Sequence, residues 1–130
     1  GINVLNNPEA FTSAQSYNSG GVILQANTSV HFQLPESKTV KGFYIFTDSD
    51  RSVGSVRFYK VSNDTEQLIY EATFDERIEY SFHTNIIIKV DIPNIVGDTF
   101  SIQFGSSNSR LVGADPRVYE LDLITEPYPE

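Results

Sequence analysis

The polar side chains that could do chemistry in this chain lie mainly in segments rich in turn-forming residues. Residues 48–54 and 105–116 each combine carboxylates, amides or guanidinium groups. Such groups form hydrogen bonds with sugar hydroxyls, and an aromatic ring packs against the apolar face of a pyranose. These residue types therefore favour carbohydrate recognition. The candidate ligand-binding residues are Tyr17, Asp48, Asp50, Arg51, Asn108 and Arg110.

Catalytic motifs are absent from the sequence. It has no Gly-x-Ser-x-Gly, no His-Glu-x-x-His, no cysteine nucleophile and no phosphate-binding glycine loop. The two histidines, His31 and His83, lie outside any recognisable motif, and His31 is expected on a solvated strand face. We predict that the chain is not an enzyme. The alternative is glycoside hydrolysis by the carboxylate pair Asp48 and Asp50.

Carboxylates in oxygen-rich loops also suit calcium. Asp48, Asp50 and Glu120 are the candidates, although no Asp-x-Asp-x-Asp-Gly pattern is present. Glu120 lies in an alternating strand pattern that can be assigned to either face. On the outward face it is a solvated residue. On the inward face it needs a partner, which a structural calcium ion would supply.

The bulk composition limits the partners. The net charge of −8 argues against nucleic acid, because few basic groups are present to neutralise phosphates. The lack of cysteine excludes disulfides and thiolate metal sites, and no apolar run is long enough for a transmembrane segment. We expect one domain over residues 1–125, excised from a larger protein, with the proline-containing residues 126–130 as a linker or tail.

Short runs of β-branched and aromatic residues recur along the chain and predict an all-β fold of about eight antiparallel strands. The clearest signal is a hairpin over residues 54–74, with a polar turn between two such runs. Its faces are expected to carry Val56 with Phe58, and Leu68 with Tyr70.

Two breaks between strands affect where the loops lie. Pro35 is expected to end one strand, and residues 93–98 are expected to form a loop. In an up-and-down sheet, this order places residues 48–54 and 105–116 at opposite ends. One missed strand would reverse that assignment, so their meeting is left open.

Four strand patterns together resemble those of discoidin-like domains, the coagulation-factor C-type, galactose-binding-like β-sandwiches. They are Val40–Phe46, Val56–Asp64, Thr99–Phe104 and Arg117–Leu123. The resemblance implies a jelly-roll sandwich with ligands at the loops of one end. It also implies carbohydrate, and in some members lipid or protein, as the ligand, with Glu120 at a calcium-associated position. The chain departs from the family in having no tryptophan, and Leu68 stands where one often occurs.

These observations predict a non-catalytic carbohydrate-binding module of an extracellular, cell-surface or virion-surface protein that functions in adhesion. Its partner would be a glycan or a cell-surface polysaccharide. The alternative is a structural or protein-interaction domain of a phage tail, capsid fibre or surface-layer assembly. In that case, edge strands or residues 111–112 would contact other protein domains.

Overall fold

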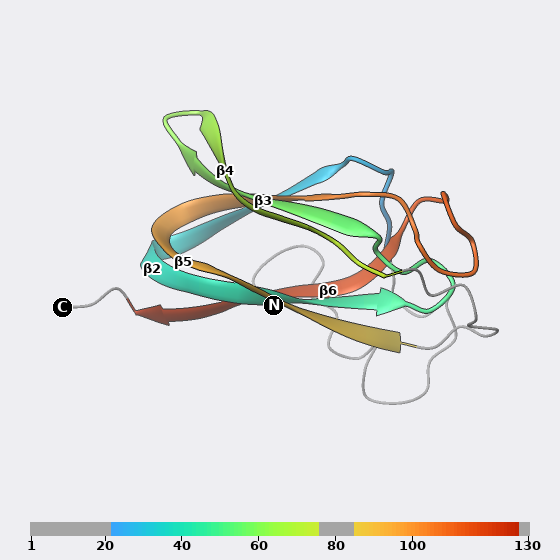
Figure 1. Ribbon diagram of the computed structural model, residues 1–130. Coiled ribbons are helices and arrows are strands. Elements are labelled where there is room, and N and C mark those ends of the chain that lie inside the picture. The colour runs from blue at the N-terminus through green and yellow to red at the C-terminus, as the bar shows by residue number, and fades with distance from the viewer. Residues whose placement is uncertain (1–21, 76–84, 128–130) are drawn as a thin grey trace.

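The computed structural model describes residues 22–75 and 85–127, which form one antiparallel β-sheet (Figure 1). Its strands are β1 Val22–Ile23, β2 Ser29–Asp48, β3 Ser55–Ser62, β4 Thr65–Thr73, β5 Asn85–Phe104 and β6 Arg117–Pro127. They are arranged in the order β1-β6-β2-β5-β3-β4. The predicted all-β, antiparallel class is confirmed for these residues, none of which is helical. Tyr17 lies outside the described residues.

The two longest strands, β2 and β5, are 20 residues each and bend where sequence analysis placed breaks. Their pairing skips from Gln33 to Lys38 on β2, and a second register shift follows between Val40 and Gly42. Pro35 lies in the first irregularity, where the missing N–H of proline costs no ladder hydrogen bond. The predicted loop at 93–98 is wrong, because β5 continues through it. The sequence predicted about eight short strands, and the described sheet has six.

The bend brings two parts of the sheet face to face around an aromatic core. Phe58 of β3 stacks on Phe43 of β2 at a ring-centroid distance of 5.5 Å, and on Phe100 of β5 at 5.4 Å. Because β2 and β3 are not neighbours in the sheet, the first contact links separate parts of it. Phe100, Ile102 and Phe104 are all fully buried, which confirms their predicted inward alternation.

The predicted hairpin is formed by β3 and β4. Its turn residues Asn63 and Asp64 both have positive φ, 50° and 61°, as in the tight turns that suit twisted hairpins. Leu68 does not share the face of Tyr70 as expected, and it is 47% exposed. The reason is a bulge: Phe58 pairs with Tyr70 and the next residue pairs with Leu68, so Ile69 is extra and the alternation reverses.

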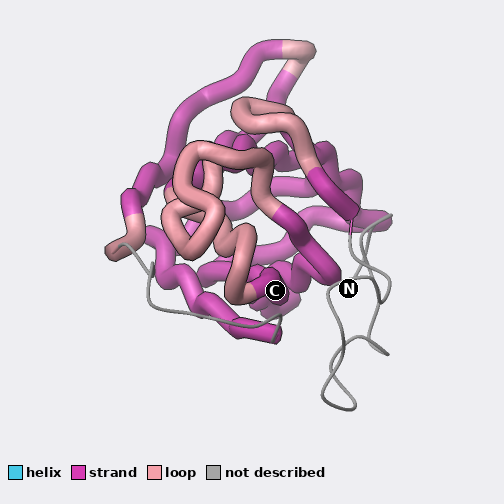
Figure 2. The backbone as a smooth tube through the Cα atoms, turned by 90° about the vertical axis from the view of Figure 1, so that its right-hand side faces the viewer, coloured by secondary structure: helices cyan, strands magenta, loops and turns pink. Residues whose placement is uncertain are grey.

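The loops that follow β2 and β5 lie at the same end of the molecule (Figures 1 and 2). The view in Figure 2 looks onto them, and they fill the centre of that face. The up-and-down assignment, which separated the two loops, is therefore wrong. The assignment failed because β5 continues past residue 93 instead of ending in a loop there. The part of the chain that the structure describes contains no helix with the length and apolar character needed to cross a bilayer.

Candidate functional site

Residues 48–54 and 105–116 meet in what we call the loop junction. Backbone N–H groups of one loop donate to carbonyl oxygens of the other: Gly54 to Ser106 at 3.1 Å, and Leu111 to Asp50 at 3.0 Å. A side-chain Cβ at Gly54 would lie 2.4 Å from the Ser106 oxygen, so the close approach requires glycine. The junction is therefore held by the main chain as well as by side chains.

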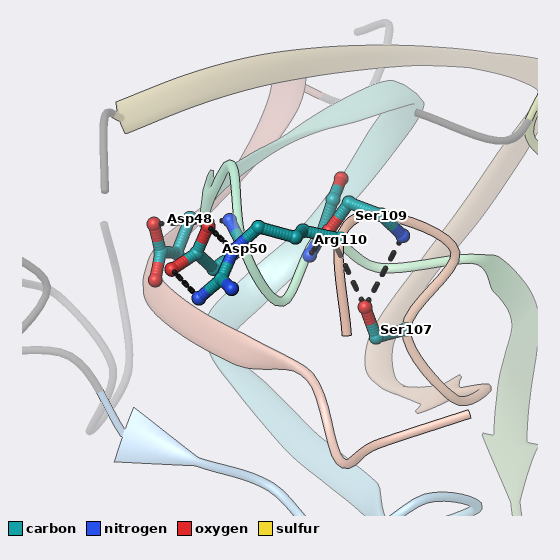
Figure 3. Close-up of polar contacts among 6 residues, drawn as sticks. Asp48, Asp50, Ser107, Ser109 and Arg110 are labelled. Atoms are coloured by element: carbon teal, nitrogen blue, oxygen red, sulfur yellow. Dashed lines mark hydrogen bonds and ion pairs between the residues drawn. The ribbon is translucent and has the colours of Figure 1, made fainter. Parts of the chain in front are cut away.

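An ion pair lies at the centre of the junction (Figure 3). Arg110 donates from Nε to Asp50 Oδ1 at 2.8 Å and from Nη2 to Asp50 Oδ2 at 2.9 Å. The Asp50 side chain is 1% exposed and that of Arg110 is 44% exposed. This two-point contact raises the pKa of Arg110, with a smaller contribution from the nearby charge of Asp48. Both oxygens of Asp50 are thus engaged within the protein.

Asn108 and Arg51 connect the junction to neighbouring strands. The buried Asn108 amide donates to the backbone oxygens of Phe74 at 3.1 Å and Asp75 at 2.7 Å, just beyond the end of β4. The carbonyl oxygen of Arg51 accepts from the N–H of Arg117 at 3.0 Å, at the start of β6. These contacts fix the path of the backbone. They give a structural role to two residues that the sequence predicted to contact sugar.

Tyr119, near the start of β6, is a buried tyrosine whose hydroxyl resists deprotonation. Its side chain is 1% exposed, and its pKa is raised to about 12. Burial is the main cause, because it disfavours the phenolate, and the carboxylate of Asp48 acts in the same direction. Asp48 is itself fully buried at the end of β2. Its carboxylate oxygen accepts a long hydrogen bond, 3.4 Å, from the Asp50 N–H.

Glu120 is buried, with 6% of its surface exposed, but it does not face the main core. Phe46 pairs with Glu120 and the next residue pairs with Val118, so Tyr119 is an extra residue in β6. Val118 and Leu121 therefore both reach the core, and the ambiguous alternation is explained by a bulge. Glu120 instead shares a hydrogen bond with Asp122. Burial is the largest single influence and acts to raise the pKa of Asp122, but hydrogen bonding, including that with Glu120, and nearby positive charge together outweigh it, so the net shift is downward.

The carboxylates named in the calcium hypothesis are Asp48, Asp50 and Glu120. Among residues 22–75 and 85–127, no group of three or more histidine, aspartate or glutamate side chains is placed to hold a metal ion. Asp48, Asp50 and Glu120 thus do not form one ligand set. A structural calcium ion at Glu120 therefore stays a prediction that rests on the discoidin-like resemblance.

A second polar region is open to solvent. It is a groove of about 470 Å³ between the outer faces of β2 and β5 and the turn of the β3–β4 hairpin, which we call the hairpin groove. Its lining residues are Ser29, His31, Val61, Asp64, Glu66 and Thr99. Its volume lies within the range of small-molecule sites. His31 is exposed as predicted.

One carboxylate in the hairpin groove has a fixed orientation. Ser101, which is fully buried, donates its hydroxyl to Glu66 Oε2 at 2.7 Å. Ser101 pairs with His31 in the sheet register, so the two strands present polar groups side by side. The sequence held a usable signal, because polar residues alternate outward in both 29–33 and 99–103. Their adjacency depends on the long-range pairing of β2 with β5.

A smaller hollow of about 270 Å³ lies along β3 and β4. Arg57 and Glu71, which line it, form an ion pair with each other at 3.1 Å. Their charged groups already have partners within the hairpin. The hairpin groove is therefore the better candidate for binding a ligand.

No family model matches the chain, and no curated protein sequence matches it significantly. The discoidin-like resemblance thus stays a prediction that rests on strand patterns. The site must be interpreted from its own geometry.

Proposed function

We propose that this chain is a non-catalytic carbohydrate-binding module that binds its glycan in the hairpin groove. The observation that carries the proposal is the open groove with Glu66 held by the buried Ser101 hydroxyl. Preorganised polar groups in a concave surface are what small polar ligands require. This proposal moves the contact site away from the loop junction, whose acid Asp50 is engaged by Arg110.

The chemistry of the groove suits neighbouring hydroxyl groups on a sugar ring. A carboxylate accepts hydrogen bonds only, so Glu66 and Asp64 would accept from sugar hydroxyls. Ser29 and Thr99 supply hydroxyls that both donate and accept, although Thr99 Oγ1 lies 3.0 Å from Asp98 Oδ1 and donates to it. Val61 and the flat ring of His31 offer apolar contact. No catalytic step forms part of the proposal.

The fold supports a sandwich interpretation of the bent sheet. Because β2 and β5 each extend through a bend, each contributes a segment to both facing parts of the sheet. Counting those segments separately gives the eight of a jelly-roll-like sandwich. We propose this architecture, with a role at a cell or particle surface, as the setting in which the groove meets its glycan.

Isothermal titration against glycans selected on a glycan array tests the proposal. Wild-type protein should bind, and Glu66→Gln should weaken binding by roughly tenfold or more, because a charge-assisted hydrogen bond is lost. Asp91→Asn is the matched control, since it removes the same charge from an exposed β5 residue that is absent from the groove lining. Asp91→Asn should leave binding unchanged.

Two outcomes would overturn this assignment. One is the absence of binding to any glycan. The other is binding that Glu66→Gln leaves intact while Tyr17→Ala abolishes it. The second outcome would return the site to Tyr17, as predicted from sequence.

A further inference from the structure

The lining of the hairpin groove is acidic. It contains two carboxylates, Asp64 and Glu66, and no lysine or arginine. A third carboxylate, Asp98, lies beside the groove, because it accepts a hydrogen bond of 3.0 Å from the hydroxyl of the lining residue Thr99. The whole chain carries a net charge of −8, so its long-range field favours the approach of cations.

The two basic side chains of β3 do not offset this charge. Val61 pairs with Glu66 on the groove side of the hairpin, so the neighbouring Lys60 faces the opposite side. Arg57 shares the face of Val61, but its guanidinium group donates to Glu71 at 3.1 Å. Neither cation of β3 therefore serves as a counter-charge for Glu66.

Glu66 is oriented by a donor that carries no charge. The buried Ser101 hydroxyl donates to its Oε2 at 2.7 Å, which fixes the carboxylate without neutralising it. A ligand that covers this carboxylate removes water from a charge, which is unfavourable unless the ligand supplies charge in return. A sugar hydroxyl offers one donor and no charge, whereas an ammonium group offers three donors and a positive charge. A carboxylate on the ligand, as in a uronic acid, would add repulsion instead.

We propose that the glycan of the hairpin groove carries protonated amino groups, as in an oligomer of glucosamine that is not N-acetylated. This inference rests on the proposed function and narrows its ligand class. The ammonium group contacts the carboxylates of Glu66 and Asp64, and ring hydroxyls contact Ser29 and Thr99. Charge supplies the preference for an amino sugar, and the hydroxyl and apolar lining distinguishes a sugar from a simple cation.

Two ligands that differ only at the amino group test this specificity. Calorimetry should compare glucosamine oligomers with N-acetylglucosamine oligomers of the same length and linkage, at a pH at which the free amines are protonated. The wild-type chain should bind the free-amine oligomer roughly tenfold more tightly. Added salt should reduce this preference, because it screens the attraction between charges in an open groove.

Charge-removing variants locate the preference. Glu66→Gln should lower the ratio of the two dissociation constants from roughly tenfold to roughly twofold, because the oriented carboxylate is lost. Asp64→Asn should lower the ratio as well. Asp91→Asn is the matched control, since it makes the same change in net charge at an exposed β5 residue that is absent from the groove lining. It should leave the ratio unchanged.

The outcomes separate this inference from the proposed function. An N-acetylated oligomer that binds as tightly as the free amine, or a ratio that Glu66→Gln leaves at its wild-type value, overturns the amino-sugar specificity. The proposed function survives that result if Glu66→Gln still weakens binding of a neutral or acidic glycan. Failure to bind any glycan overturns both. A linear polyamine of equal charge that binds as tightly as the glucosamine oligomer also overturns the inference, because charge alone would then be recognised.

Discussion

The loop junction and the hairpin groove are built from similar residues and differ in whether those residues face a partner or solvent. In the junction, the buried Asp50 carboxylate receives two hydrogen bonds from Arg110. In the groove, the exposed Glu66 carboxylate receives one, from Ser101, at Oε2. Both oxygens of Asp50 therefore accept hydrogen bonds within the fold, whereas Glu66 can still accept hydrogen bonds from a ligand.

This difference shows that polar loop composition does not by itself identify a binding site. Burying a carboxylate is unfavourable unless charge and hydrogen bonds compensate it. A buried acid is therefore expected to have partners within the protein. An acid that is oriented by one contact and otherwise exposed is the better candidate for recognising another molecule. The following experiments test the contrast, beginning with the largest expected effect on stability.

Arg110→Ala should destabilise the fold strongly, because the buried Asp50 carboxylate loses two charge-assisted hydrogen bonds. Arg57→Ala is the control, because it removes another arginine–carboxylate pair, Arg57 with Glu71 at 3.1 Å, that is largely exposed. The control should cost at most about 1 kcal/mol. Urea denaturation should show a loss for Arg110→Ala several times that of the control. Equal losses would mean that the junction pair is no more important than a surface pair.

Stability should fall between pH 10 and pH 12 because of Tyr119. Its pKa is raised to about 12 in the folded protein, so above pH 10 the unfolded state loses this proton first. The unfolded state then binds fewer protons, and the free energy of unfolding decreases by an amount on the order of 2 kcal/mol as pH rises. Tyr119→Phe should flatten this part of the denaturation profile. An unchanged slope in the variant would show that another group causes the loss.

Asn108→Ala should cost about 1–2 kcal/mol, since two backbone oxygens at the end of β4 lose their amide donor. Gln103→Ala is the control, because Gln103 Nε2 also donates to a backbone oxygen, that of Asn27 at 3.0 Å, but at an exposed position. Thermal unfolding should show a much smaller loss for Gln103→Ala. If both variants unfold alike, burial of the junction amide adds nothing.

Ser101→Ala should have the smallest effect on stability, within about 1 kcal/mol, and a clear effect on binding. Without the Ser101 hydroxyl, Glu66 is free to adopt other rotamers. Titration with the glycan found for the wild type should show affinity reduced by roughly tenfold. A variant that binds as tightly as wild type would show that the orientation of Glu66 does not matter.

The sequence predicted features that depend on local pattern. The hairpin of β3 and β4 follows from two strand-forming runs around a turn, and the burial of Phe100, Ile102 and Phe104 follows from alternation. Features that depend on pairing between distant strands were missed. Pro35 and residues 93–98 look like strand breaks, yet they lie where long strands bend and the ladder is interrupted.

The sequence identified the polar residues of the loop junction but not their arrangement. The loops at 48–54 and 105–116 were identified as polar, and the structure brings together Asp48, Asp50, Arg51, Asn108 and Arg110. Their mutual engagement could not be predicted, because it requires knowing that the loops meet. Glu120 was left ambiguous because a bulge at Tyr119 reverses the alternation without any local sequence signal. The hairpin groove was missed because it depends on the β2–β5 register.

The bend in β2 and β5 has a consequence for how the molecule unfolds. Each of these strands belongs to both facing parts of the sheet, and Phe58 bridges them through its two ring contacts. Loosening one part would withdraw strand partners from the other, so no seam exists along which the described sheet can separate. Amide hydrogens in the stretches paired on both sides, Phe43–Phe46 of β2 and Phe100–Gln103 of β5, should therefore exchange with solvent only when the whole sheet melts.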